Sequence, residues 1–278
     1  MDIRLIALDL DGTLLTTDKR VTKYTVGVLS RAAERGIYIV PATGRSLTGL
    51  SSKIRSLPFV RYAITVNGAA VWDMEQQKLI MRRAFSKEQA VELWDFISRY
   101  HTMQDACIDG IARMAPEYYN KVEEFMPDEP RRLLIRSTRK PTENLRNLVS
   151  DEKTTVEKFN LFFRADAEEK RQQAKTELEE LGGLSVTSSL GNNLEINHAD
   201  ATKGRGLLSL AAYLGLSAEQ LMAFGDGEND ISMLQAAGLG AAMENAPKEV
   251  KAAADWVTLS NDEEGVAYGI EKYVLTDR

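Results

Sequence analysis

Two carboxylates stand one residue apart at the end of the first apolar run of the chain, which reads IALDLDGTLL. Asp9 and Asp11 occupy positions i and i+2 of an expected strand, so their side chains project to the same side. Two ionised carboxylates about 4 Å apart repel each other by roughly 4 kcal/mol at an effective dielectric constant of about 20. The pair therefore predicts a site that uses both acids and holds a cation to offset their repulsion.

Three further groups of residues could act together with this pair. They are Thr43-Gly44-Arg45 after a second β-rich run, Lys203 at the start of an expected helix, and the segment GDGEND over 225–230 after the run LMAF. Ligands of an open parallel sheet bind beyond the carboxyl ends of its strands, so these groups are expected to meet at one edge. Oxygen ligands of this kind suit Mg²⁺, which commonly binds one or two carboxylates together with a substrate phosphate.

The elements expected around these residues change in type along the chain. Short β-rich runs alternate with amphipathic helical stretches over 3–66, and the alternation returns from 193 onward. Such alternation is typical of a parallel sheet that helices cover. The interpretation is an α/β fold, with a doubly wound, Rossmann-like core over 1–84 and 190–278 and an inserted α/β cap domain over 85–189.

Local patterns predict the elements of the inserted segment. Helices are expected over 86–101 and 167–181, and strands over 103–109, 111–115, 131–137 and 154–163. In the core, a helix is expected over 46–54, and the pair Asn67-Gly68 is a hairpin signal.

The composition is that of an ordinary globular chain, with 278 residues of which 44% are hydrophobic and 27% charged. The net charge of -6 argues against a nucleic-acid partner, because nucleic-acid binding depends on Lys and Arg neutralising phosphates. The single cysteine, Cys107, cannot form an intramolecular disulfide and is expected to fill space in the cap. Without a signal-peptide pattern or a membrane-spanning apolar run, we expect a cytoplasmic protein whose partner is a small molecule.

The four motifs, taken in order, resemble those of a known superfamily. DLDGTL, TGR, Lys203 before Gly204, and GDGEND are similar to the motifs of the haloacid dehalogenase (HAD) superfamily of phosphatases. The long segment between TGR and Lys203 resembles the large α/β cap, type IIB, of the Cof-type sugar phosphatase branch, and the resemblance covers essentially the whole chain. Asn197 and His198 depart from the family pattern, which has Pro and a small or basic residue there, and this affects only the expected shape of the local loop.

The resemblance implies a catalytic role for four of the matching residues. Asp9 is the implied nucleophile that becomes an aspartyl phosphate, a form of covalent catalysis that carboxylates perform. Asp11 is the implied acid that protonates the leaving alkoxide and then the base that activates water. Thr43, with the backbone of Gly44, would hydrogen-bond the phosphoryl oxygens, and Lys203 would neutralise them.

The resemblance also implies Mg²⁺ as the cofactor. Asp9, Asp226 and the backbone carbonyl of Asp11 would hold the ion, with Asn229 and Asp230 in direct or water-mediated support.

Two other polar residues remain open to either interpretation. Asn67 would lie near the pocket mouth and contact substrate, although an Asn in an Asn-Gly pair is often only a turn residue. Arg45 could contact the substrate phosphate or be a surface charge.

The function that this pattern predicts is a Mg²⁺-dependent phosphatase of small phosphate monoesters, with sugar phosphates as the favoured substrates. A phosphomutase that uses the same nucleophile on sugar phosphates is an alternative. A second is a non-enzymatic phospho-acceptor module, although receiver modules are much shorter and have no cap. A dinucleotide-binding oxidoreductase is disfavoured because no Gly-x-Gly-x-x-Gly pattern follows the first strand.

Overall fold

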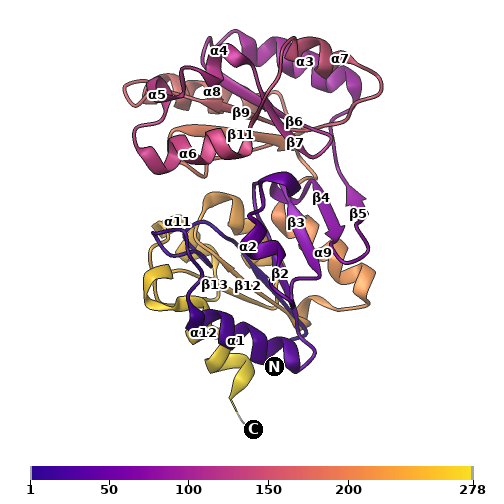
Figure 1. The fold of residues 1–278 in the computed structure, drawn as a ribbon, viewed down its shortest axis with the longest axis vertical. Coiled ribbons are helices and arrows are strands. Elements are labelled where there is room, and N and C mark those ends of the chain that lie inside the picture. The colour runs from indigo at the N-terminus through magenta and orange to yellow at the C-terminus, as the bar shows by residue number, and fades with distance from the viewer. Residues whose placement is uncertain (1, 277–278) are drawn as a thin grey trace. The chain divides into compact units, whose positions relative to one another are not determined.

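The computed structural model describes residues 2–276, and these form two compact units (Figure 1). The core unit runs to Gly44 and includes Ser52–Arg82 and the chain from Thr202 onward. The cap unit consists of Arg45–Ser51 and Arg83–Ala201. The cap is thus inserted in the middle of the chain that forms the core.

The core unit is built on a parallel sheet with the strand order β14-β13-β12-β1-β2. Its strands are β1 (Leu5–Leu8), β2 (Tyr38–Pro41), β12 (Leu221–Gly225), β13 (Leu239–Ala242) and β14 (Trp256–Val257). Every residue of β1 is buried, as expected of a strand that is covered on both faces. An antiparallel sheet next to β2 contains β3 (Tyr62–Thr65), β4 (Ala70–Asp73) and β5 (Lys78–Arg82).

Helices cover both faces of the parallel sheet. They are α1 (Lys23–Glu34), α2 (Ser52–Arg55), α9 (Lys203–Leu214), α10 (Ile231–Ala236), α11 (Lys248–Ala253) and α12 (Gly265–Ile270). On one face, Leu207 of α9 and Met233 of α10 belong to the same apolar cluster as Leu5 of β1. On the other face, α1 lies beside α12 (Figure 1). Gly269 of α12 packs closely against the ring of Phe224. This doubly wound arrangement confirms the predicted fold class.

The cap unit contains a mostly antiparallel sheet with the order β10-β11-β9-β6-β7-β8. Its strands are β6 (Met103–Ile108), β7 (Ile111–Met114), β8 (Lys140–Pro141), β9 (Val156–Phe162), β10 (Leu184–Thr187) and β11 (Asn193–His198). Its helices are α3 (Lys87–Ser98), α4 (Pro116–Tyr119), α5 (Val122–Phe125), α6 (Glu129–Thr138), α7 (Leu145–Ser150) and α8 (Glu168–Glu180).

The two faces of the cap sheet differ in chemistry. One face carries Phe159, Leu161 and Ile196, which form a large apolar core with α3, α7 and α8. The opposite face is apolar only at one end, where Met103 and Phe162 pack with residues of α5 and α6. Farther along that face, the polar side chains of Asp105, Asn160 and Glu195 lie beside one another in the strand register.

The structure places the second boundary between core and cap later than the sequence predicted. The segment 193–198 was expected in the core, but it forms β11, which pairs antiparallel with β9 and β10 of the cap sheet. Its alternating Leu194 and Ile196 complete the apolar core of the cap. The division between units falls after Ala201 and not at 189/190.

Two other local predictions were wrong. The run over 131–137, expected as a strand, lies within helix α6, because Asp128 caps the helix by accepting from the Arg131 N–H at 2.9 Å and Pro130 fits the first turn. The helix expected over 46–54 is divided into a 3-10 turn, Leu47–Gly49, and the short α2.

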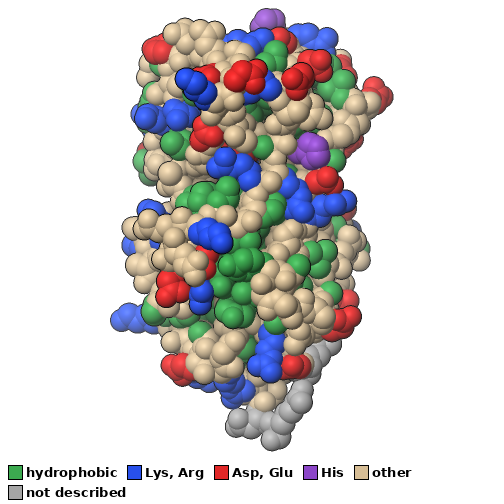
Figure 2. Space-filling model, turned by 90° about the vertical axis from the view of Figure 1, so that its right-hand side faces the viewer, with side chains coloured by type: hydrophobic (Ala, Val, Ile, Leu, Met, Phe, Trp, Pro, Cys, Tyr) green, Lys and Arg blue, Asp and Glu red, His purple; other side chains and the backbone are tan. Residues whose placement is uncertain are grey.

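The surface mixes both signs of charge on the face drawn in Figure 2, where Lys and Arg side chains lie beside Asp and Glu side chains. Within residues 2–276, none of the helices combines the length and the apolar composition that a bilayer crossing needs.

Candidate active site

The parallel register brings the predicted site residues to one edge of the core sheet. Leu8, the last residue of β1, is paired with Pro41 of β2 and with Phe224 of β12. The Asp9 N–H continues this ladder by donating to the Phe224 carbonyl at 3.0 Å. The residues that follow these three strands therefore lie at the same edge, where open α/β sheets bind ligands.

A buried ammonium joins two of the carboxylates. Lys203 Nζ donates to Asp9 Oδ1 at 2.6 Å and to Asp230 Oδ1 at 2.6 Å. Lys203 is fully buried, and Asp9 and Asp230 are only 7% and 1% exposed. A Lys that is buried to this extent needs ionic partners, because an unpaired buried charge is very costly.

The pKa values show an imbalance of negative charge. Burial raises the pKa of the Asp9 carboxyl well above its usual range, and repulsion from Asp230 and Asp226 adds to this against the attraction of Lys203. Burial alone would lower the pKa of Lys203, but the carboxylates of Asp230 and Asp9 outweigh it and raise that pKa. The ammonium is thus held charged, while the acids are more crowded than one ammonium can compensate.

Asp226 completes a group that could hold a metal ion. One carboxylate oxygen from each of Asp9, Asp226 and Asp230 lies within 4.8 Å of the others. Burial, helped by repulsion from Asp230, raises the pKa of Asp226 to about 6. Three ionised carboxylates and one ammonium leave two negative charges in excess, and the donors are all hard oxygens. This donor set fits Mg²⁺.

Asp230 also organises the loop that carries Asp226. Its Oδ2 accepts the backbone N–H groups of Asp226 at 3.0 Å and of Gly227 at 2.9 Å, while its Oδ1 faces Lys203. Thr13 donates its hydroxyl to Asp226 Oδ1 at 2.7 Å. Sequence reasoning missed Thr13, although its position directly after Gly12 in DLDGTL was an available signal.

The carboxylate of Asp11 lies outside the metal-binding group of the described residues. Its Oδ1 accepts from Lys19 Nζ at 2.8 Å, and its side chain is 31% exposed. The two acids at the end of β1 therefore have different surroundings, since Asp9 is buried beside Lys203. Lys19 was not predicted, and nothing in its local sequence distinguishes it from other surface lysines.

A second set of predicted residues is linked by hydrogen bonds. The buried Thr43 accepts the Asn67 N–H at its carbonyl at 3.1 Å, and Asn229 Nδ2 donates to Asn67 Oδ1 at 3.1 Å. Asn67 is 3% exposed and adopts a left-handed φ of 57°, in the turn between β3 and β4. It thus forms the predicted hairpin turn and also connects Thr43 to Asn229. Gly44 ends the first stretch of the core unit, whereas Arg45 belongs to the cap unit.

Gly204, which follows the buried Lys203, packs α9 closely against α10. A Cβ on Gly204 would lie 2.1 Å from the Ser232 carbonyl oxygen, and the Gly204 N–H donates to the Ser232 hydroxyl at 3.1 Å. The glycine is therefore required by close packing, and this contact fixes the position from which Lys203 reaches the carboxylates.

We predict that Gly204→Ala lowers the free energy of unfolding by about 1–3 kcal/mol, the usual cost of overpacking. Gly27→Ala in α1 is the matched control, because a Cβ there would meet no atom within 4 Å. The control should raise the free energy of unfolding by about 0.5–1 kcal/mol, since Ala favours a helix over Gly. Urea denaturation measures both, and equal effects would contradict the packing argument.

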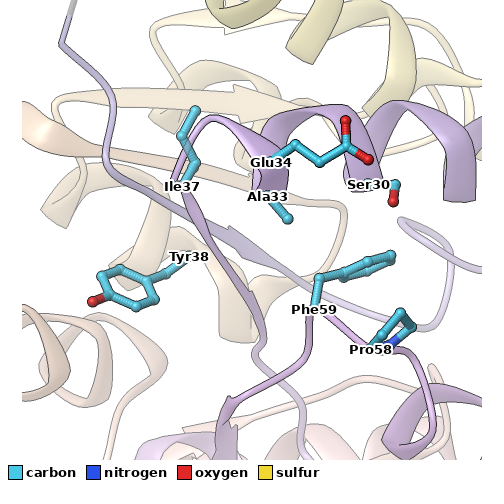
Figure 3. A pocket seen from close by; sticks show the side chains of 8 residues that line it. Ser30, Ala33, Glu34, Ile37, Tyr38, Pro58 and Phe59 are labelled. Atoms are coloured by element: carbon cyan, nitrogen blue, oxygen red, sulfur yellow. The ribbon is translucent and has the colours of Figure 1, made fainter.

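A separate pocket of about 480 Å³ lies elsewhere in the core unit. Figure 3 shows Pro58 and Phe59 across from Ala33 and Glu34 of α1. It is located where β2 begins, whereas the site residues follow the ends of strands. The charged side chain that lines this pocket is the acidic Glu34, which would repel a phosphate. We therefore interpret the pocket as an ordinary surface hollow.

Comparison with known proteins identifies the family. The chain matches the haloacid dehalogenase-like hydrolase family over residues 6–270. The chain belongs to this family. One relative is YcsE of Bacillus subtilis, a 5-amino-6-(5-phospho-D-ribitylamino)uracil phosphatase. The two sequences are 30% identical over an alignment that covers 99% of this chain and 97% of YcsE.

Solved structures of this hydrolase family have the same fold. A haloacid dehalogenase-like hydrolase from B. subtilis superposes with a TM-score of 0.84 at 28% sequence identity. The superposition covers 98% of this chain and 100% of the B. subtilis chain. The HAD subclass IIB sugar phosphatase BT4131 superposes with a TM-score of 0.78 at 22% sequence identity. The superposition covers 97% of this chain and 98% of the BT4131 chain, so the two share a fold. The chain is therefore a phosphoric monoester hydrolase of the haloacid dehalogenase type.

Proposed function

We propose that this hydrolase is a Mg²⁺-dependent phosphatase of small phosphate monoesters, with sugar phosphates as preferred substrates and Asp9 as the nucleophile. One observation supports this above the others. Asp9, Asp226 and Asp230 converge beyond the ends of parallel strands, with the buried Lys203 bonded to two of them. Phosphoryl transfer requires this combination of a positioned nucleophile and concentrated charge stabilisation.

In the proposed reaction, an oxygen of Asp9 attacks the phosphorus of the ester and the bond to the alcohol oxygen breaks. Asp11 gives its proton to that oxygen, so the alcohol leaves neutral. Asp11 then takes a proton from a water molecule, which attacks the phosphorus of the aspartyl phosphate and releases inorganic phosphate. The carboxylate of Asp9 and the protonated Asp11 are thereby restored. The more exposed position of Asp11, beside Lys19, supports a role in contact with both alcohol and water.

The other site residues would hold the phosphoryl group and the metal. Lys203, the Thr43 hydroxyl and the Gly44 backbone would bind the phosphoryl oxygens. Mg²⁺ would be held by Asp9 and Asp226 and by the Asp11 carbonyl, with direct or water-mediated support from Asn229 and Asp230. When bound, the ion would supply charge neutralisation to the phosphoryl oxygens. Asp230 is already bonded to Lys203 and to two backbone N–H groups, so we assign it mainly to positioning.

The relatives support the substrate class. The substrate in the name of YcsE carries its phosphate on a ribityl chain, which is a hydroxyl-rich carbon chain. A phosphorylated sugar or polyol presents the same kind of monoester to the site.

The test is a panel of phosphorylated sugars, polyols and nucleotides with Mg²⁺, scored by release of inorganic phosphate. We predict release from sugar or polyol phosphates with no bisphosphate activator, and a loss of at least about 100-fold in excess chelator that added Mg²⁺ reverses. Isomerisation of the sugar phosphate without phosphate release would instead identify a phosphomutase. Full activity in excess chelator would refute the metal site.

A further inference from the structure

Asp11 lies in a tight turn of the core unit that directly follows β1. The Leu15 N–H donates to the Leu10 carbonyl at 2.8 Å, which closes this short stretch of chain. We call residues 11–15 the Asp11 turn. Because the side chain of Asp11 is partly exposed, its position depends on how firmly the turn itself is held.

The Asp11 turn lies against the carboxylate of Asp226. Gly12 has a left-handed φ of 90°, and a Cβ on it would lie 2.3 Å from Asp226 Oδ2. Thr13 donates its hydroxyl to Asp226 Oδ1 at 2.7 Å. The turn is thus packed against the group of carboxylates that could hold the metal. Any shift of the turn would therefore move Asp11 relative to that group.

Two asparagines from distant parts of the chain bind the Asp11 turn at two places. Asn245, in the loop after β13, donates from Nδ2 to the Gly12 carbonyl at 2.9 Å. Asn261, in the loop after β14, donates from Nδ2 to the Leu15 carbonyl at 2.9 Å. The Asn261 N–H also donates to Asn245 Oδ1 at 3.0 Å. These three hydrogen bonds form one connected chain that spans the turn from Gly12 to Leu15.

The loop after β14 also holds the hairpin that follows the Asp11 turn. Asp262 accepts the Thr17 N–H at 2.8 Å and the Thr17 hydroxyl at 2.7 Å. Thr17 belongs to the hairpin 16–20, whose Lys19 bonds to the Asp11 carboxylate at 2.8 Å. One loop thus fixes both the turn that carries Asp11 and the hairpin that carries its ionic partner.

The exposure of the two asparagines favours a role in placement over a role in stability. Asn245 is exposed and Asn261 is partly exposed. Water can replace much of an exposed hydrogen bond, and even a typical one contributes only about 0.5–1.5 kcal/mol to the free energy of unfolding. A shift of a catalytic group by about 1 Å, in contrast, can lower a rate by about 100-fold.

We propose that Asn245 and Asn261 are positioning residues for proton transfer to the leaving alcohol, because they hold the Asp11 turn in place. This inference rests on the proposed phosphatase function. In that reaction Asp11 gives its proton to the alcohol oxygen as the ester bond breaks, so the two groups must be within hydrogen-bond reach. In this assignment neither asparagine touches the substrate, and both act through the backbone of the turn.

The experiment compares two esters that differ in their need for a proton donor. An alkoxide leaves poorly without a proton, whereas 4-nitrophenolate is a stable anion that leaves without one. The first ester is the sugar or polyol phosphate with the highest wild-type kcat/KM in the substrate panel, and the second is 4-nitrophenyl phosphate. The ratio of their kcat/KM values reports the cleavage of the ester, because the later hydrolysis of the aspartyl phosphate is common to both.

For Asn245→Ala we expect this ratio to fall about 10-fold, which is part of the roughly 10²- to 10⁴-fold that a positioned acid contributes. Its kcat/KM for 4-nitrophenyl phosphate should stay within about 3-fold of wild type, because that ester needs no proton. If Asn245→Ala lacks a cooperative thermal transition, Asn261→Ala is measured in its place with the same expectation.

Thr25→Val is the matched control. Thr25 of α1 donates its hydroxyl to Glu264, in the same loop as Asn261, so this change removes a hydrogen bond to the loop without touching the Asp11 turn. Its ratio should equal that of wild type. An unchanged ratio in the folded asparagine variant overturns the inference, as does an equal loss on both esters or a similar fall with Thr25→Val. If wild type released phosphate from no alkyl phosphate, the proposed function would be contradicted instead.

Discussion

Asp9→Asn is expected to lower turnover of any phosphate ester by at least about 10⁴-fold, because removal of a catalytic nucleophile typically costs this much or more. The amide cannot attack phosphorus as the carboxylate does, and it cannot form the aspartyl phosphate. The measurement is steady-state phosphate release with Mg²⁺ in excess. After an acid quench, mass spectrometry should detect one added phosphoryl group on wild type during turnover and none on the variant.

Asp9→Asn should still fold, and the pKa of Asp9 indicates whether the substitution raises or lowers the stability of the folded state. A carboxyl whose pKa is raised in the folded state keeps its proton where the unfolded chain has lost it, so its ionisation reduces stability as pH rises through that range. Asn does not ionise. Without Mg²⁺ at pH 7.5, the variant should therefore melt at or above the temperature of wild type.

Asp18→Asn provides the matched control for the nucleophile. It makes the same chemical change nearby in the chain, but the Asp18 side chain is 74% exposed and forms an ion pair with the similarly exposed Arg20. Its turnover should stay within about 2-fold of wild type, as exposed ion pairs contribute little. Near wild-type turnover by Asp9→Asn would show that another group attacks phosphorus.

The convergence of the site could be predicted because it depends on local signals and one topological rule. Asp9, Thr43 and Asp226 each follow a strand, and parallel strands place their carboxyl ends at one edge. The structure also brings Asn67 to Asn229 through a hydrogen bond, which a turn signal alone did not require. The contact of Lys203 with Asp230 joins residues 27 positions apart, so local pattern could suggest it only through the family resemblance.

The cap was less predictable because its contacts are not local. The alternation of Leu194 and Ile196 correctly indicated a strand, but an alternating strand carries no mark of which sheet it joins. For α6, the apolar run favours a strand, but Asp128 as the N-cap and Pro130 in the first turn start a helix there. Asp105, Asn160 and Glu195 lie side by side because β6, β9 and β11 pair in one register, and a single sequence does not contain that register.

Lys203→Met is expected to lower kcat/KM by about 100-fold or more, because it removes one charged donor from the phosphoryl site. It should also lower the free energy of unfolding by about 3–5 kcal/mol, since it leaves Asp9 and Asp230 buried without their ammonium. Lys251→Met is the control. Lys251 is 30% exposed and lies 3.9 Å from Glu244, so its loss should change stability by less than about 1 kcal/mol and leave kcat/KM unchanged.

Loss of activity through simple unfolding is separated from loss of charge by a second substitution. Asp230→Asn added to Lys203→Met removes one of the two stranded carboxylates, so the double variant should regain part of the lost stability. Its activity should not return, because neither amide nor thioether can neutralise a phosphoryl oxygen. Stability is measured by denaturation and activity by phosphate release, on wild type, Lys203→Met, Asp230→Asn and the double variant. If activity returned together with stability, Lys203 would have a structural role alone, and the phosphoryl charge would have to be met by other groups.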